Sequence, residues 1–166
     1  MENFKVIRVE VEKRPDEHFS TKNRWVQTAH QSGYTTITEC HPSQLYFING
    51  HFSSNDIQQL SSTLLADPVT EHFTISTDTS PPNAPNTPAS NADTHNIEVT
   101  LMPGVTDPVA ENLLRTARLL GLDGIIQAAT GQRYIVHGEL DPQDLHTLAT
   151  SVFSNPVIQR YAVNQP

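Results

Sequence analysis

The sequence has little of what secretion, membrane insertion or nucleic-acid binding requires. Its single cysteine, Cys40, allows no internal disulfide, as is typical of proteins in a reducing compartment. Ten Lys and Arg residues against 18 Asp and Glu give a net charge of −8, and no segment is basic enough to suit a phosphate backbone. No apolar run approaches the ~18 residues of a membrane helix, and the N-terminus lacks the basic start and apolar core of a secretory signal. We therefore expect a cytoplasmic protein that binds neither nucleic acid nor membranes.

The common motifs of catalysis are also missing. The sequence has no G-x-x-x-x-G-K-[ST] phosphate loop, and no glycines frame Cys40 as a nucleophile elbow requires. Cys40 precedes His41, but neighbouring strand residues point to opposite faces, so we expect a packed thiol rather than a thiolate pair. The eight histidines, at positions 18, 30, 41, 51, 72, 95, 137 and 146, show no close metal-ligand spacing and are expected to be scattered over the surface. We accordingly expect no catalytic residue, bound cofactor or metal in this chain.

The sequence does contain an internal repeat. Residues 9–75 align with residues 97–163 at a constant shift of 88 residues without a gap, and the identical pairs include two glycines and a proline. These pairs are Gly33 with Gly121, Gly50 with Gly138, and Pro68 with Pro156. Such a period is too long for a solenoid, so the repeat predicts two copies of one small unit.

A polar segment rich in proline separates the two copies. Residues 77–95 contain four prolines and no large apolar side chain, so they are expected to be disordered and to act as a tether. The sequence thus divides into a first repeat at 1–76, a linker at 77–95 and a second repeat at 96–166.

Hydrophobic periodicity predicts the order β-α-β-β-α-β in each copy. Apolar residues alternate in 7–11 and 97–101, as in half-buried strands. Asp107-Pro108 is typical of a helix start and Gly121 of a helix end; the weaker counterpart in the first copy is carried by Trp25 and ends at Gly33. The pattern then predicts two short strands, a second helix and a last strand in each copy.

This order is that of the ferredoxin-like split unit, with two helices on one face of an antiparallel sheet. The other face is uncovered, and a unit of this size is marginal alone. We therefore expect an α+β protein in which two ferredoxin-like units pack sheet to sheet as an intramolecular pseudo-dimer, because this packing would remove the uncovered faces from water.

The second copy contains three motifs, the opening VTLMPGVTDP at 99–108, GQRYI at 131–135 and the closing FSNPVIQRY at 153–161. These motifs resemble the PurS family, the small subunit of bacterial phosphoribosylformylglycinamidine synthase. Departures are Ala110, where the family usually has glycine, and Gln132-Arg133, where it usually has Gly-Lys. The tandem arrangement resembles the PurS-like N-terminal region of the large, single-chain form of the synthase.

The resemblance implies a non-catalytic subunit. It would bridge a PurL-type synthetase and a PurQ-type glutaminase and support ammonia transfer between them, while these partners use ATP, Mg²⁺ and glutamine. A homodimer of tandem chains is a further expectation. The candidate partner interface consists of Pro103, Gly104, Asp107, Pro108, Gly131, Arg133, Asn155 and Pro156.

Two other functions stay open at this point. Paired ferredoxin-like units often bind ligands at a shared interface, which makes a small-molecule sensing module the second hypothesis. A catalytic α+β barrel ranks last, because it needs convergent polar groups between the sheets, whereas the inward strand positions are mainly Val, Ile and Leu.

Overall fold

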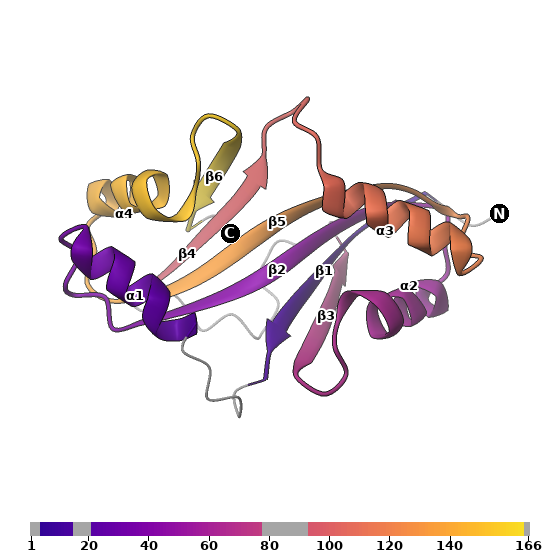
Figure 1. Cartoon of the computed structure of the whole chain (residues 1–166), viewed down its shortest axis with the longest axis horizontal. Coiled ribbons are helices and arrows are strands. Elements are labelled where there is room, and N and C mark those ends of the chain that lie inside the picture. The colour runs from indigo at the N-terminus through magenta and orange to yellow at the C-terminus, as the bar shows by residue number, and fades with distance from the viewer. Residues whose placement is uncertain (1–3, 15–20, 78–92, 165–166) are drawn as a thin grey trace. The chain divides into compact units, whose positions relative to one another are not determined.

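The computed structural model describes residues 4–14, 21–77 and 93–164 and has the α+β class expected from the sequence. Both halves of the chain have the same order of elements (Figure 1). In the first half these are β1 (Lys5–Lys13), α1 (Thr21–Gln31), β2 (Glu39–Gly50), α2 (Ser54–Leu60), the π-helical turn η1 (Ser61–Leu65) and β3 (Glu71–Thr77). In the second half they are β4 (Thr94–Leu101), α3 (Pro108–Leu119), β5 (Ile125–His137), α4 (Pro142–Leu148), the π-helical turn η2 (Ala149–Phe153) and β6 (Gln159–Val163).

The predicted linker, 77–95, overlaps a strand at each of its two ends. Thr77 is the last residue of β3 and Thr94 is the first of β4. Residues 78–92 lie outside the described residues, and so does the prediction that they form a disordered tether. Within the described part of the chain, no helix combines the length and the apolar character needed to cross a membrane.

The middle strand of each half is longer than predicted. The sequence predicts a hairpin of two short strands in each half, at 35–40 with 45–49 and at 124–128 with 133–137. This prediction was wrong, because β2 and β5 are single strands that neighbour each other, and a continuous ladder replaces the two hairpins. Pro42 is tolerated inside β2 where the alternation of buried residues breaks between Cys40 and Ser43, a pattern typical of a β-bulge.

The chain divides into two compact units, and each unit takes segments from both halves. Unit 1 comprises Met1–Glu17, Ser43–Ser80 and Thr106–Gly131; unit 2 comprises His18–Pro42, Pro81–Val105 and Gln132–Pro166. The long strands cause this exchange, because β2 begins in unit 2 and ends in unit 1, whereas β5 begins in unit 1 and ends in unit 2. The strand order is β3-β1-β2-β5 in unit 1 and β2-β5-β4-β6 in unit 2.

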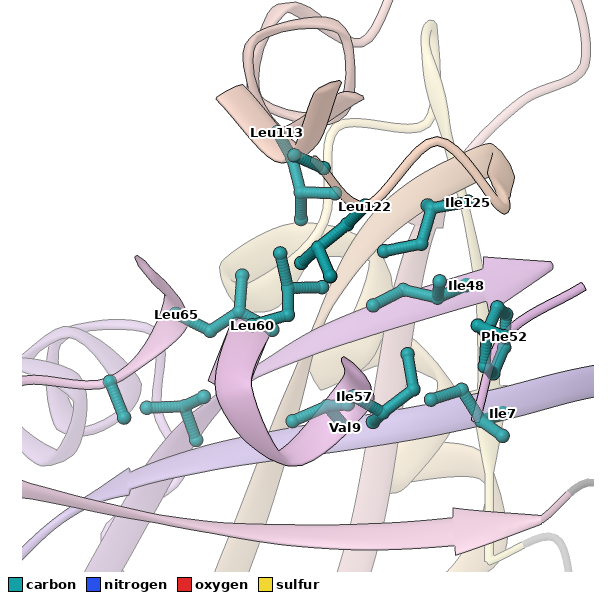
Figure 2. Packing of buried hydrophobic residues seen from close by; sticks show 13 residues of the cluster. Ile7, Val9, Ile48, Phe52, Ile57, Leu60, Leu65, Leu113, Leu122 and Ile125 are labelled. Carbon is teal, nitrogen blue, oxygen red and sulfur yellow. The ribbon is translucent and has the colours of Figure 1, made fainter. Parts of the chain in front are cut away.

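The core of unit 1 combines strands of the first half with helix α3 of the second. The residues Ile7, Val9 and Val11 alternate along β1 and are all buried on one face. Helices α2 and α3 cover this face, and their side chains form one cluster with it (Figure 2). The cluster includes Ile7, Val9, Val11, Ile48, Phe52, Ile57, Leu60, Leu65, Leu113, Ala117, Leu122 and Ile125. Each large aliphatic side chain contributes about 1.5–3 kcal/mol on burial, so the second half supplies a substantial part of the stability of this unit.

The core of unit 2 shows the reverse combination. Strands β4 and β6, the end of β5 and helix α4 come from the second half, while α1 and the start of β2 come from the first. The buried cluster consists of Ala29, Ile37, Cys40, Ile97, Val99, Tyr134, Val136, Leu145, Leu148, Ala149 and Phe153. Trp25 of α1 packs on it, with ring centroids 5.0 Å from Tyr134 and 5.3 Å from Phe153. The sequence favours a core or domain contact for Trp25 over a contact with a partner, and its packing on this cluster confirms a core contact.

Two details of the expected architecture need correction. Each repeat was expected to cover its own strands with its own two helices, but α1 and α3 cover strands of the other half, because β2 and β5 carry the chain from one unit to the other. The prediction that the two repeats pack sheet to sheet is also wrong. Within each unit the two halves meet edge to edge, since β2 and β5 are neighbours in one sheet.

Candidate functional site

Three of the candidate interface residues lie close together in unit 1. Asp107 caps α3, since its Oδ1 accepts the Ala110 N–H at 3.0 Å, and Pro108 occupies the first turn. The other oxygen of Asp107 accepts both the N–H (2.7 Å) and the hydroxyl (2.9 Å) of Thr130, the residue before Gly131. Asp107 therefore fixes the start of α3 to β5, and its carboxylate is used for structure. Thr130 and Gly131 were predicted as a turn but lie inside β5.

Gly131 also takes part in the pairing between the halves. Its carbonyl accepts a hydrogen bond of 2.8 Å from the Gln44 side chain of β2. The sequence predicts that Gly131 is needed for a hairpin turn. This prediction is wrong, because Gly131 lies inside the continuous strand β5.

Four other candidate residues meet in unit 2. The Met102 N–H donates to the carbonyl of Ile158 at 2.9 Å, which sets the Pro103-Gly104 turn beside the Asn155-Pro156 turn. Gly104 has φ +86, so its turn requires the left-handed conformation that glycine adopts freely. The opening and closing motifs of the PurS resemblance are thus neighbours in space, although about 50 residues separate them along the chain.

The Asn155-Pro156 turn presents an apolar side chain on a fixed backbone. The Asn155 side chain accepts the Val157 N–H (3.1 Å), and the Asn155 N–H donates to the Gln159 side chain (2.7 Å). Val157, at the tip, is 80% exposed. This turn is therefore rigid in its backbone and apolar at its surface.

Unit 1 has a matching turn at Asp67-Pro68. The Asp67 carboxylate accepts the N–H of Val69 (2.8 Å) and Thr70 (3.2 Å), and these backbone hydrogen bonds lower the pKa of Asp67. Val69 occupies the tip and is 77% exposed. The two turns differ mainly in that the capping group is charged in unit 1 and neutral in unit 2.

Arg133 does not join the other candidate residues. It lies on β5, and its Nε donates to the Asn96 side chain of β4 at 3.0 Å. This contact explains the arginine as a link between neighbouring strands of unit 2.

One shallow depression of about 240 Å³ lies on the described surface of unit 1. Its cationic residue, Arg14, donates to the carbonyls of Glu71 (3.1 Å) and Pro68 (3.2 Å). Binding sites for small molecules are usually larger, about 300–1,000 Å³, and offer polar groups that converge on the ligand. Because Arg14 is engaged with the backbone, this depression does not favour the ligand-sensor hypothesis.

Cys40 is a core residue, as the sequence predicts. It has no exposed surface, it forms no disulfide, and burial raises the pKa of its thiol to about 12. We expect a thiol reagent at pH 8 to leave folded protein unmodified, because the thiolate fraction is roughly 1,000-fold lower than for an ordinary thiol with a pKa near 8.5. Absorbance or mass spectrometry would follow the single cysteine, which should react within minutes in denaturant. Rapid modification of the folded protein would contradict the assignment.

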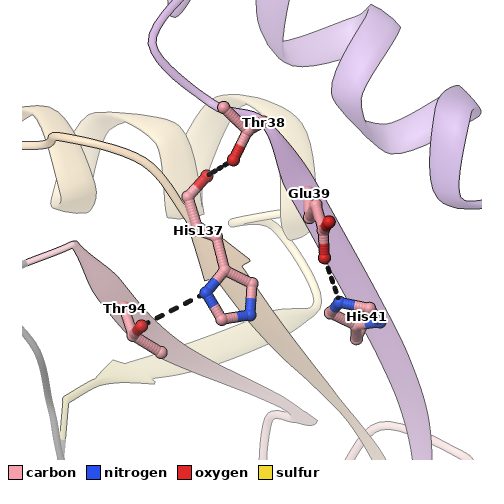
Figure 3. A network of polar contacts seen from close by, with 5 residues as sticks. All are labelled: Thr38, Glu39, His41, Thr94 and His137. Atoms are coloured by element: carbon pink, nitrogen blue, oxygen red, sulfur yellow. Dashed lines mark hydrogen bonds and ion pairs between the residues drawn. The ribbon is translucent and has the colours of Figure 1, made fainter.

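The structure brings together three polar residues that the sequence did not single out as a group. Glu39 and His41 of β2 and His137 of β5 each offer one ligand atom, and these atoms lie within 4.8 Å of one another (Figure 3). All three belong to unit 2. The i,i+2 spacing of Glu39 and His41 places them on one strand face, which the sequence could have indicated. Their proximity to His137 depends on the pairing of β2 with β5, which was not predicted.

Comparison with protein-family models matches residues 94–165 to the PurS family, described as phosphoribosylformylglycinamidine (FGAM) synthase. Among individual curated proteins, no match to this chain is found. The family match runs from the first residue of β4 past the end of β6 and includes both turns that meet in unit 2. Residues 94–165 of this chain are therefore similar to the PurS family of FGAM synthase.

Proposed function

We propose that this chain is a non-catalytic PurS-type subunit of FGAM synthase, which bridges a PurL-type synthetase and a PurQ-type glutaminase in the cytoplasm and supports ammonia transfer between them. The family match over residues 94–165 is the observation that carries the proposal. In this function ATP, Mg²⁺ and glutamine bind to the partner subunits, and the chain acts through contacts alone.

The turn at Asn155-Pro156 supports a role in binding. Val157 is 80% exposed and Ile158 is 40% exposed, and Pro103 lies on the adjacent turn. An apolar tip on a backbone that is already fixed loses little conformational freedom when a partner covers it. This surface is therefore the part of the PurS domain that we assign to contact with the synthetase.

The polar candidate residues Asp107 and Arg133 make contacts that fit a structural role better than a catalytic one. A catalytic acid or base must reach its substrate within hydrogen-bond distance. The Asp107 carboxylate is instead engaged with Ala110 and Thr130, and the Arg133 guanidinium with Asn96. These side chains hold elements of the fold in place.

We expect the purified, tagged chain to capture both partner subunits when glutamine and ADP-Mg²⁺ are present. Val157→Asp should reduce this capture at least about 10-fold, since an apolar contact that must bury a carboxylate loses more than about 1.4 kcal/mol. Val69→Asp is the matched control, because it changes the same position of the turn in unit 1, outside the family match, and should leave capture unchanged. Affinity purification with quantitative mass spectrometry measures both effects.

Reconstituted activity gives a second measurement. Glutamine-dependent synthesis should require this chain, whereas synthesis from added ammonium salt should not, because free ammonia bypasses transfer between subunits. If a folded wild-type chain recovers neither partner, the proposal is wrong. A thermal shift with a purine-pathway metabolite or an amino acid would then favour the ligand-sensor hypothesis.

A further inference from the structure

The Glu39, His41 and His137 cluster lies on the face of unit 2 that is turned away from its core. Cys40, between the first two residues, is fully buried in the core cluster, so its strand neighbours point to the opposite face. The His41 Nε2 is 2.9 Å from the Glu39 Oε2, and the His41 and His137 rings meet edge to face with centroids 5.5 Å apart. The side chains of His41 and Glu39 are 38% and 60% exposed, so an ion could reach them from solvent.

Contacts behind the cluster hold His137 in place. Its Nδ1 is 3.2 Å from the Thr94 hydroxyl, and Figure 3 shows the other ring nitrogen on the side of His41. Its carbonyl accepts the Thr38 N–H at 2.9 Å, which fixes the backbone. Histidines that bind metals usually donate their second N–H to an oxygen, because this leaves the lone pair of the other nitrogen directed at the ion. Thr94 can serve as that oxygen.

Two imidazole nitrogens and one carboxylate oxygen form a typical ligand set for Zn²⁺. Around a tetrahedral ion with bonds near 2.1 Å, the ligand atoms would lie about 3.4 Å apart. The present spread of up to 4.8 Å can contract to this value through rotation of exposed side chains. Three protein ligands leave the fourth position to water.

The internal repeat gives each residue of this cluster an equivalent in unit 1, at a shift of 88 residues in the sequence. Gln127, Ala129 and Asn49 correspond to Glu39, His41 and His137, and Val6 corresponds to Thr94. The Asn49 side chain donates to the Gln127 side chain at 3.5 Å. The strand pairing therefore forms with neutral side chains as well, which means that the fold does not require the histidines and glutamate of unit 2.

We propose that Glu39, His41 and His137 form a Zn²⁺ site that joins β2 to β5 in unit 2, with Thr94 as the positioning residue of His137. The site is distinct from the turns that are assigned to partner binding. The ion would tie a strand of the first half to a strand of the second and would stabilise the folded chain.

The test uses the full, untagged chain and Zn²⁺ alone. The variant E39Q/H41A/H137N gives unit 2 the residues that unit 1 already has at these positions, so it should fold as well as the wild type without metal. We expect wild-type protein to bind one Zn²⁺ with an affinity at least about 100-fold above that of the variant. Calorimetry with a competing chelator measures the affinity, and thermal unfolding with and without Zn²⁺ measures the stabilisation, which should occur only in the wild type.

Thr94→Val provides a second, milder variant, which introduces a hydrophobic side chain of the kind that Val6 supplies at the equivalent position of unit 1. It retains all three ligands and should weaken Zn²⁺ binding by roughly 10- to 100-fold, as loss of an outer hydrogen bond does elsewhere. Ring signals of His41 and His137 should shift in NMR spectra on Zn²⁺ addition, while those of the other histidines should not. Equal Zn²⁺ affinity in the wild type and the triple variant, or shifts confined to the other histidines, would overturn the proposal.

Discussion

Separate production of residues 1–80 and 81–166 is expected to give two fragments that are unfolded alone and fold when mixed. Each unit takes its core from both halves, so a fragment lacks part of both cores. In unit 1 the first fragment would lose Leu113, Leu122 and Ile125, each worth about 1.5–3 kcal/mol on burial. Such a loss is comparable to the whole stability of a small domain, about 5–15 kcal/mol.

Circular dichroism and thermal unfolding would test this expectation. The mixture should regain a cooperative transition whose midpoint rises with protein concentration, because two chains must now associate. The uncut chain is the control, with a midpoint that does not depend on concentration. A cooperative transition in either fragment alone would show that a half-chain contains a complete core and would contradict the exchange of helices.

Gly124→Ala is expected to be among the most destabilising single substitutions in the chain. A Cβ at this position would lie 1.8 Å from the carbonyl oxygen of His51, whose N–H donates to the Gly124 carbonyl at 2.8 Å. Backbone atoms of two chain segments would have to move apart, and the pairing of the halves in unit 1 would open at this end. We expect the free energy of unfolding to fall by about 3–5 kcal/mol.

Gly121→Ala is the matched control for this substitution. Gly121 has φ +78, but a Cβ added there would meet no atom within 4 Å, so alanine encounters only backbone strain. That strain costs about 1–2 kcal/mol. Urea denaturation of both variants would measure the difference in the free energy of unfolding, provided that this free energy depends equally on urea concentration in both. Similar losses of stability in the two variants would mean that the close approach of the backbone at Gly124 does not limit stability.

Local patterns in the sequence predicted most of the elements and core residues. Alternation predicts Val9 and Val99 as buried strand residues, and both are buried. In the second helix of each copy, the helical spacing of apolar residues predicts Leu60 and Leu148 on the inner face, and both are buried there. The Asp107-Pro108 helix start is present with the expected cap. These features depend on residues that are near one another in the chain, which is why the sequence was sufficient.

The exchange of segments could not be predicted in the same way. Pro42 and the pair Thr130-Gly131 are typical of turns, and nothing local distinguishes a turn from a strand irregularity at these positions. The decision between a hairpin and a continuous strand depends on a partner strand more than about 80 residues away. The grouping of His41 with His137 was missed for the same reason, because it requires the pairing of β2 with β5.

Two long strands shared between units also release the protein from a symmetry constraint. An assembly of two identical chains must repeat every residue in both of its units, so neither unit can acquire a group that the other lacks. In this chain each unit draws on different segments, and the same structural position is encoded twice. Glu39 and His41 stand in one unit while Gln127 and Ala129 stand in the other. One chain can therefore keep a common scaffold and give its two units different tasks.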